Sequence, residues 1–560
     1  MIQHQAPISG LSLFGQQYIA TAGYDNQIIL WNAQTRQPLQ RGWHDHLANY
    51  CDFSPDGSLL VTASSDGSTR LWSVPEFKLQ CVMTSHSDDV MQAKFSPDGE
   101  KIASCSYDSS LSVHHKNGNF VCKLQGHSGL VESFDWTSDS QQLLSCGTDG
   151  TIRAWDAATG ECLAIKETEG HDMDALVTLS AGVFIVGNND GELQVISGNT
   201  VLSSYKGHRS SVKKLVKSKF DNSLLSLGYD GVAVLWSIEG HTLVEWKRSE
   251  YPKEIWARSA EFQSREKIYF ATFGSTFAIW DITRNHWDLE GFVPSASLNS
   301  VHAAGGVIYS IGDAGLLKAD GKDLGGPQSL CNFVVKTGPV LVCGGQTGQV
   351  FDVLKNRVAY AHHAPLNCGV NFELDGEPRL AVGSYSGDII IFKINDRHLE
   401  FVSCHKIHEN AIKGISLHGN CLYTGCADGE IGVTDIRTYE VLNKITHAHE
   451  GILNDLCSYA NGVATVSRDL TLKLWGEPRS TIPSRHTHSI KCIASDDGGN
   501  FIATGSYGGT VDIYDCTARQ WLSNLRKVST AGISSLTWDD EKQRFLASSY
   551  DGRIYAVELG

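Results

Sequence analysis

The chain has 560 residues, and 46 Lys or Arg against 62 Asp or Glu give it a formal net charge of −16 at pH 7. Such an acidic balance disfavours general binding to nucleic acid or to an anionic membrane surface, since both attract basic proteins. No run of eighteen apolar residues occurs, and the opening MIQHQAPISG lacks the pattern of a signal peptide, so we expect neither a membrane span nor secretion.

Fifteen cysteines are scattered along the chain without a C-x-x-C pair. Several of them, including Cys105, Cys146, Cys343 and Cys492, fall within apolar strand patterns. This placement favours buried free thiols in a reducing compartment over disulfides. We therefore expect a cytoplasmic protein.

Three marks recur from the start of the chain: a histidine, an aspartate some twenty residues later, and a tryptophan six residues after the aspartate. Of the first three units, the second has all three marks, whereas the first and the third depart from the pattern. Their marks are Asp25 and Trp31; His44, Asp66 and Trp72; and His86, Asp108 and His114, which stands where tryptophan is expected.

The fourth unit, Gly126 to Asp156, holds the full set: His127, Asp149 and Trp155. Three short alternating runs of apolar and polar residues lie between the marks, at Val131–Trp136, Gln142–Cys146 and Thr151–Trp155. Runs of this kind, separated by Gly, Asp and Ser, predict consecutive antiparallel strands. The Asp-Gly pair is typical of a tight hairpin turn, because glycine adopts positive φ without steric cost.

This spacing resembles the WD40 repeat family, in which the marks recur about every forty residues and each repeat forms a propeller blade. The resemblance implies a buried hydrogen-bond network of histidine, aspartate, a strand hydroxyl and tryptophan in each blade. Network residues of the three most complete units in the first half are His44, Asp66 and Trp72; His127, Asp149 and Trp155; and His208, Asp230 and Trp236.

The later units follow the same spacing of marks less strictly, and the eighth and ninth units match it least. Their marks are, in order, His171, Asp190 and Ile196; His208, Asp230 and Trp236; Gly274 and Trp280; Asp313; the segment VLVCGGQTGQVFD; His363, Ser386 and Phe392; His408 and Asp428; His449, Asp469 and Trp475; His486, Gly508 and Tyr514; and Trp538 and Asp551.

Fourteen units in 560 residues predict an all-β chain of two seven-bladed propellers in tandem, with four-stranded antiparallel blades. We place the domains at residues 1–284 and 285–560 and expect the two rings to be joined directly, in a fixed relation. The C-terminal RIYAVELG is predicted to be a third strand without a fourth. We expect Trp287–Phe292 to close the second ring on the last blade, and Met1–Gln5 to close the first ring on the seventh.

No motif predicts catalysis, a cofactor or a metal. GGQTG lacks the Lys-Ser/Thr of a phosphate-binding loop, and GSYSG has Tyr where a nucleophile elbow needs Ser. Histidine pairs such as His362-His363 include a blade histidine, so the repeat explains them, whereas zinc needs three or four converging ligands.

Partner binding is expected at the loop face, defined here by the residue that precedes each hairpin aspartate. These positions are Tyr24, Ser65, Tyr107, Thr148, Asn189, Tyr229 and Phe273 in the first ring, and Gly312, Gln346, Tyr385, Ala427, Arg468, Tyr507 and Tyr550 in the second. The high share of tyrosine suits an interface anchor, although a tyrosine there also has a purely structural interpretation, as cover for the neighbouring blade.

Acidic residues follow two of the blade histidines: Asp88 and Asp89 in the third unit, and Asp172 and Asp174 in the fifth. Together with the tyrosines they favour a partner segment that carries Arg or Lys. The sequence thus indicates a non-catalytic scaffold for proteins or peptides, without nucleic acid, membrane or small-molecule ligands. The alternatives are an enzyme or enzyme subunit with a site in a central channel, and a cytoskeletal regulator resembling actin-interacting double propellers.

Overall fold

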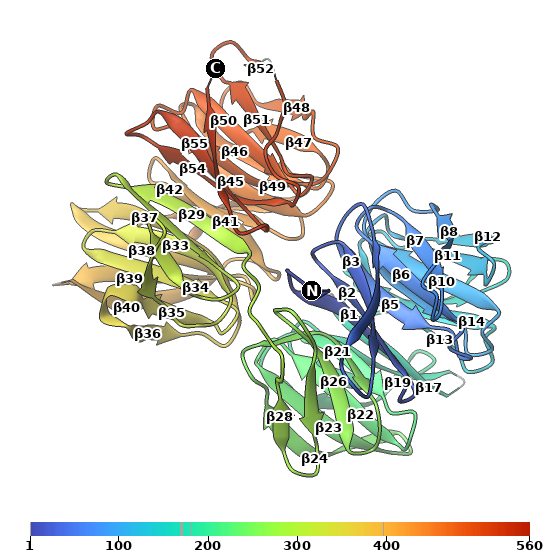
Figure 1. The fold of residues 1–560 in the computed structure, drawn as a ribbon. Coiled ribbons are helices and arrows are strands. Elements are labelled where there is room, and N and C mark those ends of the chain that lie inside the picture. Colours follow the sequence, from blue (N-terminus) through green and yellow to red (C-terminus); the bar gives the residue numbers. More distant parts are fainter. Residues whose placement is uncertain (1, 169–171, 181, 396, 523, 560) are drawn as a thin grey trace. The chain divides into compact units, whose positions relative to one another are not determined.

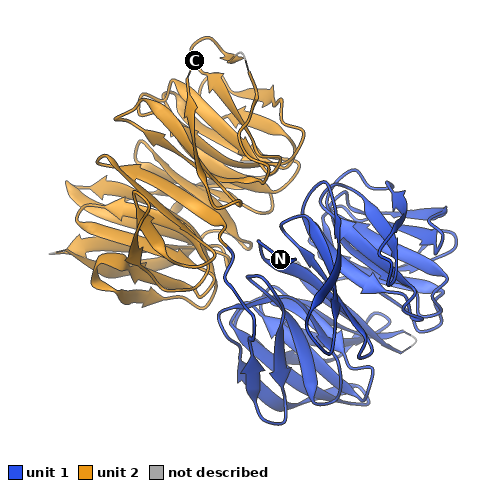
Figure 2. Cartoon of the chain, viewed as in Figure 1, with its two compact units in different colours: residues 1–295 blue, residues 296–560 orange. Residues whose placement is uncertain are grey.

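The computed structural model describes residues 2–168, 172–180, 182–395, 397–522 and 524–559, which form antiparallel sheets (Figure 1). The chain divides into two compact units, residues 1–295 and residues 296–560 (Figure 2). Each unit holds seven sheets among its described residues, and we number these sheets as blades one to fourteen in chain order.

Unit 1 consists of blades one to seven, with four strands each. The strands of blades one to four are β1 (Ile8–Phe14), β2 (Tyr18–Gly23), β3 (Gln27–Asn32), β4 (Pro38–Trp43), β5 (Ala48–Phe53), β6 (Leu59–Ser64), β7 (Thr69–Ser73), β8 (Leu79–Met83), β9 (Val90–Phe95), β10 (Lys101–Ser106), β11 (Ser110–His115), β12 (Phe120–Gln125), β13 (Val131–Trp136), β14 (Gln142–Gly147), β15 (Thr151–Asp156) and β16 (Cys162–Glu167). Those of blades five to seven are β17 (Met173–Ser180), β18 (Val183–Asn188), β19 (Glu192–Ser197), β20 (Thr200–Lys206), β21 (Val212–Lys217), β22 (Ser223–Gly228), β23 (Val232–Glu239), β24 (Thr242–Glu250), β25 (Ile255–Phe262), β26 (Lys267–Thr272), β27 (Ala278–Asp281) and β28 (His286–Asp288).

Unit 2 consists of blades eight to fourteen, and a 3-10 turn follows the third strand of blade nine. The elements of blades eight to eleven are β29 (Leu298–Ala304), β30 (Val307–Gly312), β31 (Leu317–Ala319), β32 (Lys322–Gly325), β33 (Cys331–Thr337), β34 (Val340–Gly345), β35 (Gln349–Asp352), η1 (Val353–Lys355), β36 (Arg357–Ala361), β37 (Leu366–Leu374), β38 (Glu377–Ser384), β39 (Asp388–Asn395), β40 (His398–Lys406), β41 (Ile412–His418), β42 (Cys421–Cys426), β43 (Ile431–Asp435) and β44 (Val441–Ile445). Those of blades twelve to fourteen are β45 (Leu453–Tyr459), β46 (Gly462–Ser467), β47 (Thr471–Leu474), β48 (Ser480–Pro483), β49 (Ile490–Ser495), β50 (Phe501–Ser506), β51 (Thr510–Asp515), β52 (Gln520–Trp521), β53 (Arg526–Lys527), β54 (Ile533–Asp539), β55 (Arg544–Ser549) and β56 (Ile554–Glu558).

Each unit closes on itself through the first strands of its blades. In unit 1 the order is β1, β5, β9, β13, β17, β21 and β25, and β25 lies beside β1 again. In unit 2 the order is β29, β33, β37, β41, β45, β49 and β54, and β54 returns to β29. The predicted fold, two seven-bladed propellers in one all-β chain, is therefore confirmed.

The hairpin between the second and third strand of a blade shows why the sequence folds this way. In blade four, an Oδ of Asp149 accepts a hydrogen bond from the backbone N–H of Thr151 at 3.0 Å, and Gly150 has φ of +66°. Glycine adopts this left-handed conformation without the steric cost that a Cβ brings. The turn sets the strand register from which Trp155 enters the core.

The hydrophobic core of each unit lies between neighbouring blades rather than inside a single sheet. Phe134, Trp136 and Trp155 of blade four pack with Leu111 and Val113 of blade three in one buried cluster. Another cluster joins blades one and seven, so the last interface of unit 1 is packed like the others. A single four-stranded sheet cannot bury both of its faces, and stacking around a ring solves this for every blade.

Both predictions about ring closure are wrong. His286–Asp288 forms β28 and pairs with β27, so the Trp287 segment completes blade seven instead of blade fourteen. Met1 lies outside the described residues, and residues 2–5 of the predicted segment form no strand; His4 belongs to the hydrogen-bond network of blade one. Because β28 stays with the first ring, the units divide after Ser295, whereas the sequence suggested 284.

The last blade has three strands among the described residues, and β56 covers most of the predicted third strand. Blade thirteen has a short fifth strand, because β53 pairs with β51 beside β52. The cysteines expected to be buried, Cys105, Cys146, Cys343 and Cys492, are buried free thiols. In the described part of the chain, no helix has the length and apolar character needed to cross a bilayer.

Candidate functional site

The blade network is a chain of short hydrogen bonds. In blade four, His127 Nδ1 lies 2.8 Å from an Asp149 carboxylate oxygen, and His127 Nε2 lies 2.8 Å from Ser145 Oγ. The indole N–H of Trp155 donates to the same hydroxyl at 2.8 Å. Such a network favours a single strand register, because a shifted register would leave buried polar groups without hydrogen-bond partners. It lowers the pKa of Asp149, since its hydrogen bond and ion pair with His127 outweigh the cost of burial.

The other two sequence-derived networks have the same geometry. His44 Nδ1 is 3.0 Å from Asp66, and His208 Nδ1 is 3.0 Å from Asp230. The partner hydroxyls, which also accept from the blade tryptophans, are Thr62 for Trp72 and Ser226 for Trp236. His171 of blade five lies outside the described residues.

Two histidines were misplaced or missed from the sequence. His4 completes blade one, where its Nδ1 is 3.0 Å from Asp25 and its Nε2 is 2.8 Å from Thr21. In blade ten the blade histidine is His362 rather than His363. The available signal was a constant distance: a blade histidine stands four residues before the first strand, as His44 does before Ala48.

The loop-face residues lie at the mouth of the central channel. The backbone N–H of Tyr24 donates to Pro7 O at 2.9 Å, that of Tyr107 to Asp89 O at 3.0 Å, and that of Phe273 to Glu254 O at 2.8 Å. Each acceptor directly precedes an innermost strand. The channel mouth is therefore formed jointly by hairpin turns and by the starts of innermost strands.

One side of the unit 1 mouth is aromatic. Trp256, the second residue of β25, meets the Tyr24 ring edge-on at a centroid distance of 5.0 Å and stacks on Phe273 at 5.4 Å. The Arg258 guanidinium lies 5.5 Å from the Trp256 ring centroid. Phe273 is 4% exposed, whereas Tyr24 is half-buried. Phe273 thus serves mainly as cover for this cluster, while Tyr24 keeps an accessible edge.

The other side of the unit 1 mouth is charged. Tyr107 Oη lies 3.2 Å from a Glu132 carboxylate oxygen, and Lys213 Nζ lies 2.7 Å from Asp174. The same ammonium is 5.1 Å from the Tyr229 ring centroid. Burial raises the pKa of Glu132, and the nearby Asp174 carboxylate adds to the rise. Asp174 is therefore already paired within the chain.

The remaining predicted acid, Asp89, is half-buried at the start of β9, and its backbone N–H donates to Asp88 Oδ1 at 2.7 Å. Sequence reasoning missed Glu132, Lys213, Trp256 and Arg258. All four lie at or near the second position of an innermost strand, where side chains of neighbouring blades converge.

In unit 2 some of the loop-face residues form pairs across neighbouring blades. The Lys413 ammonium lies 4.8 Å from the Tyr385 ring centroid, and Tyr507 stacks on Tyr550 with centroids 6.1 Å apart and planes 12° apart. Arg468 is half-buried in the turn between β46 and β47. These pairs span neighbouring blades, in keeping with a structural role.

Asparagines at the second position of innermost strands join neighbouring blades. Each side-chain amide donates to the carbonyl of the first residue of the next innermost strand, at 2.7–3.0 Å. The five pairs are Asn49 with Val90, Asn299 with Cys331, Asn332 with Leu366, Asn367 with Ile412, and Asn454 with Ile490. Four of them line the unit 2 channel, a cavity of about 320 Å³ that Lys413 and Lys491 also line.

A larger cavity, about 650 Å³, lies at the opposite mouth of the unit 1 channel. Its charged walls contain Asp52 and Glu261, which also join neighbouring blades: they accept from the backbone N–H groups of Phe95 at 2.9 Å and Leu13 at 2.7 Å. Burial raises the pKa of the Asp52 carboxyl to about 6. Because these carboxylates already accept hydrogen bonds from neighbouring blades, they have less capacity to bind a ligand in the cavity.

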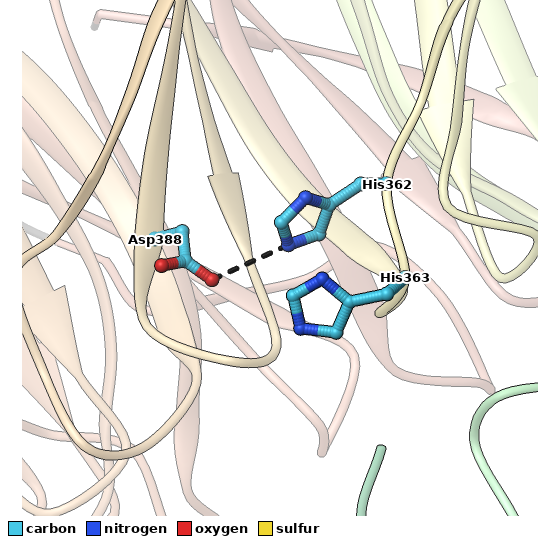
Figure 3. Close-up of side chains that lie close together, drawn as sticks. All are labelled: His362, His363 and Asp388. Atoms are coloured by element: carbon cyan, nitrogen blue, oxygen red, sulfur yellow. Dashed lines mark ion pairs between the residues drawn. The ribbon is translucent and has the colours of Figure 1, made fainter. Parts of the chain in front are cut away.

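Within the described part of the chain, two groups of side chains have the composition of a metal site, and both are in unit 2. In blade ten, His362 Nε2 lies 3.3 Å from an Asp388 oxygen and 3.1 Å from Ser386 Oγ, and the His363 ring lies 4.2 Å from the His362 ring (Figure 3). Potential ligand atoms of His362, His363 and Asp388 lie within 4.8 Å of one another. In blade eleven, those of His408, Cys426 and Asp428 do so as well.

The comparison with known families agrees with this architecture. Residues 38–73, 77–115, 118–156 and 476–515 match the family described as WD domain, G-beta repeat. Three of these segments lie in unit 1 and one lies in unit 2. Each matched segment starts at or just before the outer strand of one blade and continues through the first three strands of the next blade.

Similar proteins carry the same repeats. The 77 kDa echinoderm microtubule-associated protein of Strongylocentrotus purpuratus is 25% identical over 279 residues, which cover 42% of this chain and 40% of that protein. WD repeat-containing protein 1 of Gallus gallus is 29% identical over 211 residues, which cover 34% of this chain and 33% of that protein. The matches thus span less than half the length of these curated relatives.

Proposed function

Because the chain carries WD40 repeats in both of its compact units, we propose that it is a non-catalytic scaffold that binds proteins or peptides on its loop faces. Proteins with such repeats generally serve as interaction scaffolds, and the fold agrees with that role. We also propose a cytoplasmic location, which the buried free thiols support.

The observation that carries the proposal is the mixed aromatic and acidic mouth of unit 1. Tyr24 keeps an accessible edge there, and Asp88 and Asp89 are half-buried beside the mouth. Lys213 pairs with Asp174, and the Arg258 charge acts on Glu132, so the net negative charge of the mouth comes from Asp88 and Asp89. An aromatic edge next to net negative charge suits an extended segment with Arg or Lys, through charge pairing and cation–π contact.

A peptide series of equal length and graded charge tests this proposal by fluorescence anisotropy at two salt concentrations. Basic peptides should bind more tightly than neutral or acidic ones, and less tightly at high salt. Asp89→Asn with Tyr24→Ala should weaken this binding about tenfold or more, whereas Tyr18→Ala, a half-buried tyrosine at the start of β2 and not a loop-face position, serves as the matched control. Equal binding of acidic and basic peptides would reject the assignment of partner chemistry.

The actin-binding alternative makes a different prediction. A regulator of that kind should co-sediment with filaments of purified actin in proportion to their concentration. Under the scaffold proposal, pelleting of the chain with filaments should not depend on actin concentration. The loop-face variants above should then leave the sedimentation unchanged.

A further inference from the structure

Blade eleven departs from a hydrogen-bond network that six other blades share. In six blades, Nδ1 of the blade histidine lies 2.8–3.1 Å from a carboxylate oxygen of the hairpin aspartate. These pairs are His4 with Asp25, His44 with Asp66, His86 with Asp108, His127 with Asp149, His208 with Asp230, and His449 with Asp469. In blade eleven the histidine and aspartate are both present, as His408 and Asp428, but Asp428 is exposed and the bond is not made.

The unused atom of His408 is buried. The residue is 0% exposed, and among the described residues its Nδ1 has no hydrogen-bond partner. Its Nε2 lies 2.9 Å from Thr424 Oγ1, and that hydroxyl in turn lies within donating distance, 3.4 Å, of Gly432 O. The hydroxyl therefore accepts from Nε2–H, which leaves a lone pair on Nδ1. A buried acceptor without a donor costs free energy unless something fills its place.

The surroundings of this atom offer further ligands. The Cys426 thiol is 0% exposed, and its sulfur, an Asp428 oxygen and a His408 ring nitrogen lie within 4.8 Å of one another. A Glu430 oxygen is 3.7 Å from His408 Nδ1. Cys426 is also unusual for its position: at the same place, the end of the second strand, blades two, twelve and thirteen have Ser64, Ser467 and Ser506.

We propose that His408, Cys426 and Asp428 form a binding site for a divalent transition metal ion of the zinc type, with Glu430 placed to supply a fourth ligand. Imidazole nitrogen, thiolate sulfur and carboxylate oxygen are the ligand atoms that zinc takes in proteins. The hydrogen bond from Nε2 to Thr424 orients the ring as outer-shell partners of metal-bound histidines do.

Binding of the metal ion at this site releases one proton. The Cys426 S–H bond breaks, the proton passes to solvent, and the thiolate binds the ion, while Nδ1 and the carboxylate bind through existing lone pairs. Asp428, exposed on the loop face, gives the ion a route from solvent. Cys426 ends β42, and the His408 ring, in the connection before β41, is held by its hydrogen bond to Thr424 of β42.

Titration of the full chain with Co²⁺ tests the proposal, because cobalt takes zinc ligands and reports thiolate coordination by a charge-transfer absorption band. The wild-type chain should bind one ion with this band, and Zn²⁺ should displace the cobalt. Cys426→Ser should abolish the band and weaken binding at least tenfold. The variant should fold, because serine occupies this position in blades two, twelve and thirteen.

Two controls separate this site from other ligands on the chain. Cys404→Ser removes an exposed thiol, and His363→Ala removes a member of the blade ten group; both should leave the cobalt band unchanged. Asp428→Asn, an exposed change that does not touch the core, should weaken binding while keeping the band. Absence of the band in the wild-type chain, or its survival in Cys426→Ser, would overturn the proposal.

Discussion

Trp280 and Trp287 lie face to face on neighbouring strands, with ring centroids 5.3 Å apart and planes 3° apart. Trp287 also contacts Phe270 at a centroid distance of 4.8 Å. These contacts hold β28 on the outer edge of blade seven. They explain why the segment after Asn285 belongs to the first ring, although the sequence alone allowed it to serve the second.

Replacing Trp287 with alanine should therefore destabilise unit 1. Loss of the stacked ring removes apolar contact on both sides of β28, and a half-buried tryptophan at such a place is worth about 2 kcal/mol. Denaturant unfolding measures the change. Trp246→Ala, on an outer strand where the ring is 47% exposed, should change the unfolding free energy much less. Equal effects of the two variants would contradict the packing role of Trp287.

Ser145→Ala tests the blade network without changing the backbone. Its Oγ joins His127 Nε2 and Trp155 Nε1, both at 2.8 Å, so the substitution leaves two buried polar atoms without a partner. We expect a loss of about 2–4 kcal/mol in unfolding free energy. Ser138→Ala, at an exposed position in the turn between β13 and β14, is the matched control and should be nearly neutral. If Ser145→Ala lowered the unfolding free energy no more than Ser138→Ala does, the network would contribute little to stability.

The sequence predicts the hydrogen-bond network of a blade, but it does not predict where the Trp287 segment packs. The spacing of His127, Asp149 and Trp155 encodes the blade directly, because each network bond requires a fixed separation along the chain. The placement of Trp287 depends on long-range packing, which periodicity does not contain. His362 was misassigned by one residue because blade ten lacks the hairpin aspartate and has Ser386 in its place.

The loop-face residues show the same limit. Turn position alone identified Tyr107 and Tyr229, yet their partners come from innermost strands: Glu132 from the next blade and Lys213 from the same blade. Which side chains meet at a channel mouth depends on ring closure, and that is a property of seven blades together. The unused Nδ1 of His408 was also hidden, because the sequence marks of blade eleven match those of blades that complete the network.

Asn49→Ala should weaken the contact between blades two and three. The Asn49 amide donates to Val90 O at 3.0 Å and to Ser65 Oγ at 3.0 Å, and the residue is 7% exposed. Removing it leaves the carbonyl without this donor, at a cost of about 1–2 kcal/mol. Native-state hydrogen exchange should report faster exchange in β5 and β9, with little change in unit 2. Uniform acceleration across the whole chain would argue against a local clamp.

Unfolding free energy should fall as the pH drops from 6.5 towards 4. Burial lowers the pKa of His114, His302 and His486 to about 4, below the ordinary value of 6.5. Between these values the unfolded chain binds more protons than the folded chain, so each group removes about 1.4 kcal/mol of stability per pH unit. Denaturant unfolding at a series of pH values measures the slope, and stability that rose steadily down to pH 4 would contradict this prediction.

The Asp455 carboxyl has the opposite effect on the pH dependence of the unfolding free energy, and a single substitution tests it. Burial raises the pKa of its carboxyl to about 6 from 3.8, so the folded chain binds the extra proton between these values, and this group stabilises the fold as the pH falls. Asp455→Asn keeps an oxygen that can accept the Ile493 N–H, which lies 3.2 Å from the carboxylate. The variant should be more stable than wild type at pH 7.5 by about 2–3 kcal/mol, because it removes a buried charge. Most of that gain should be lost by pH 4, where the folded wild-type carboxyl is protonated, and the rest below pH 3.8, where the unfolded carboxyl is protonated as well. A gain independent of pH would mean that the charge is not the cause.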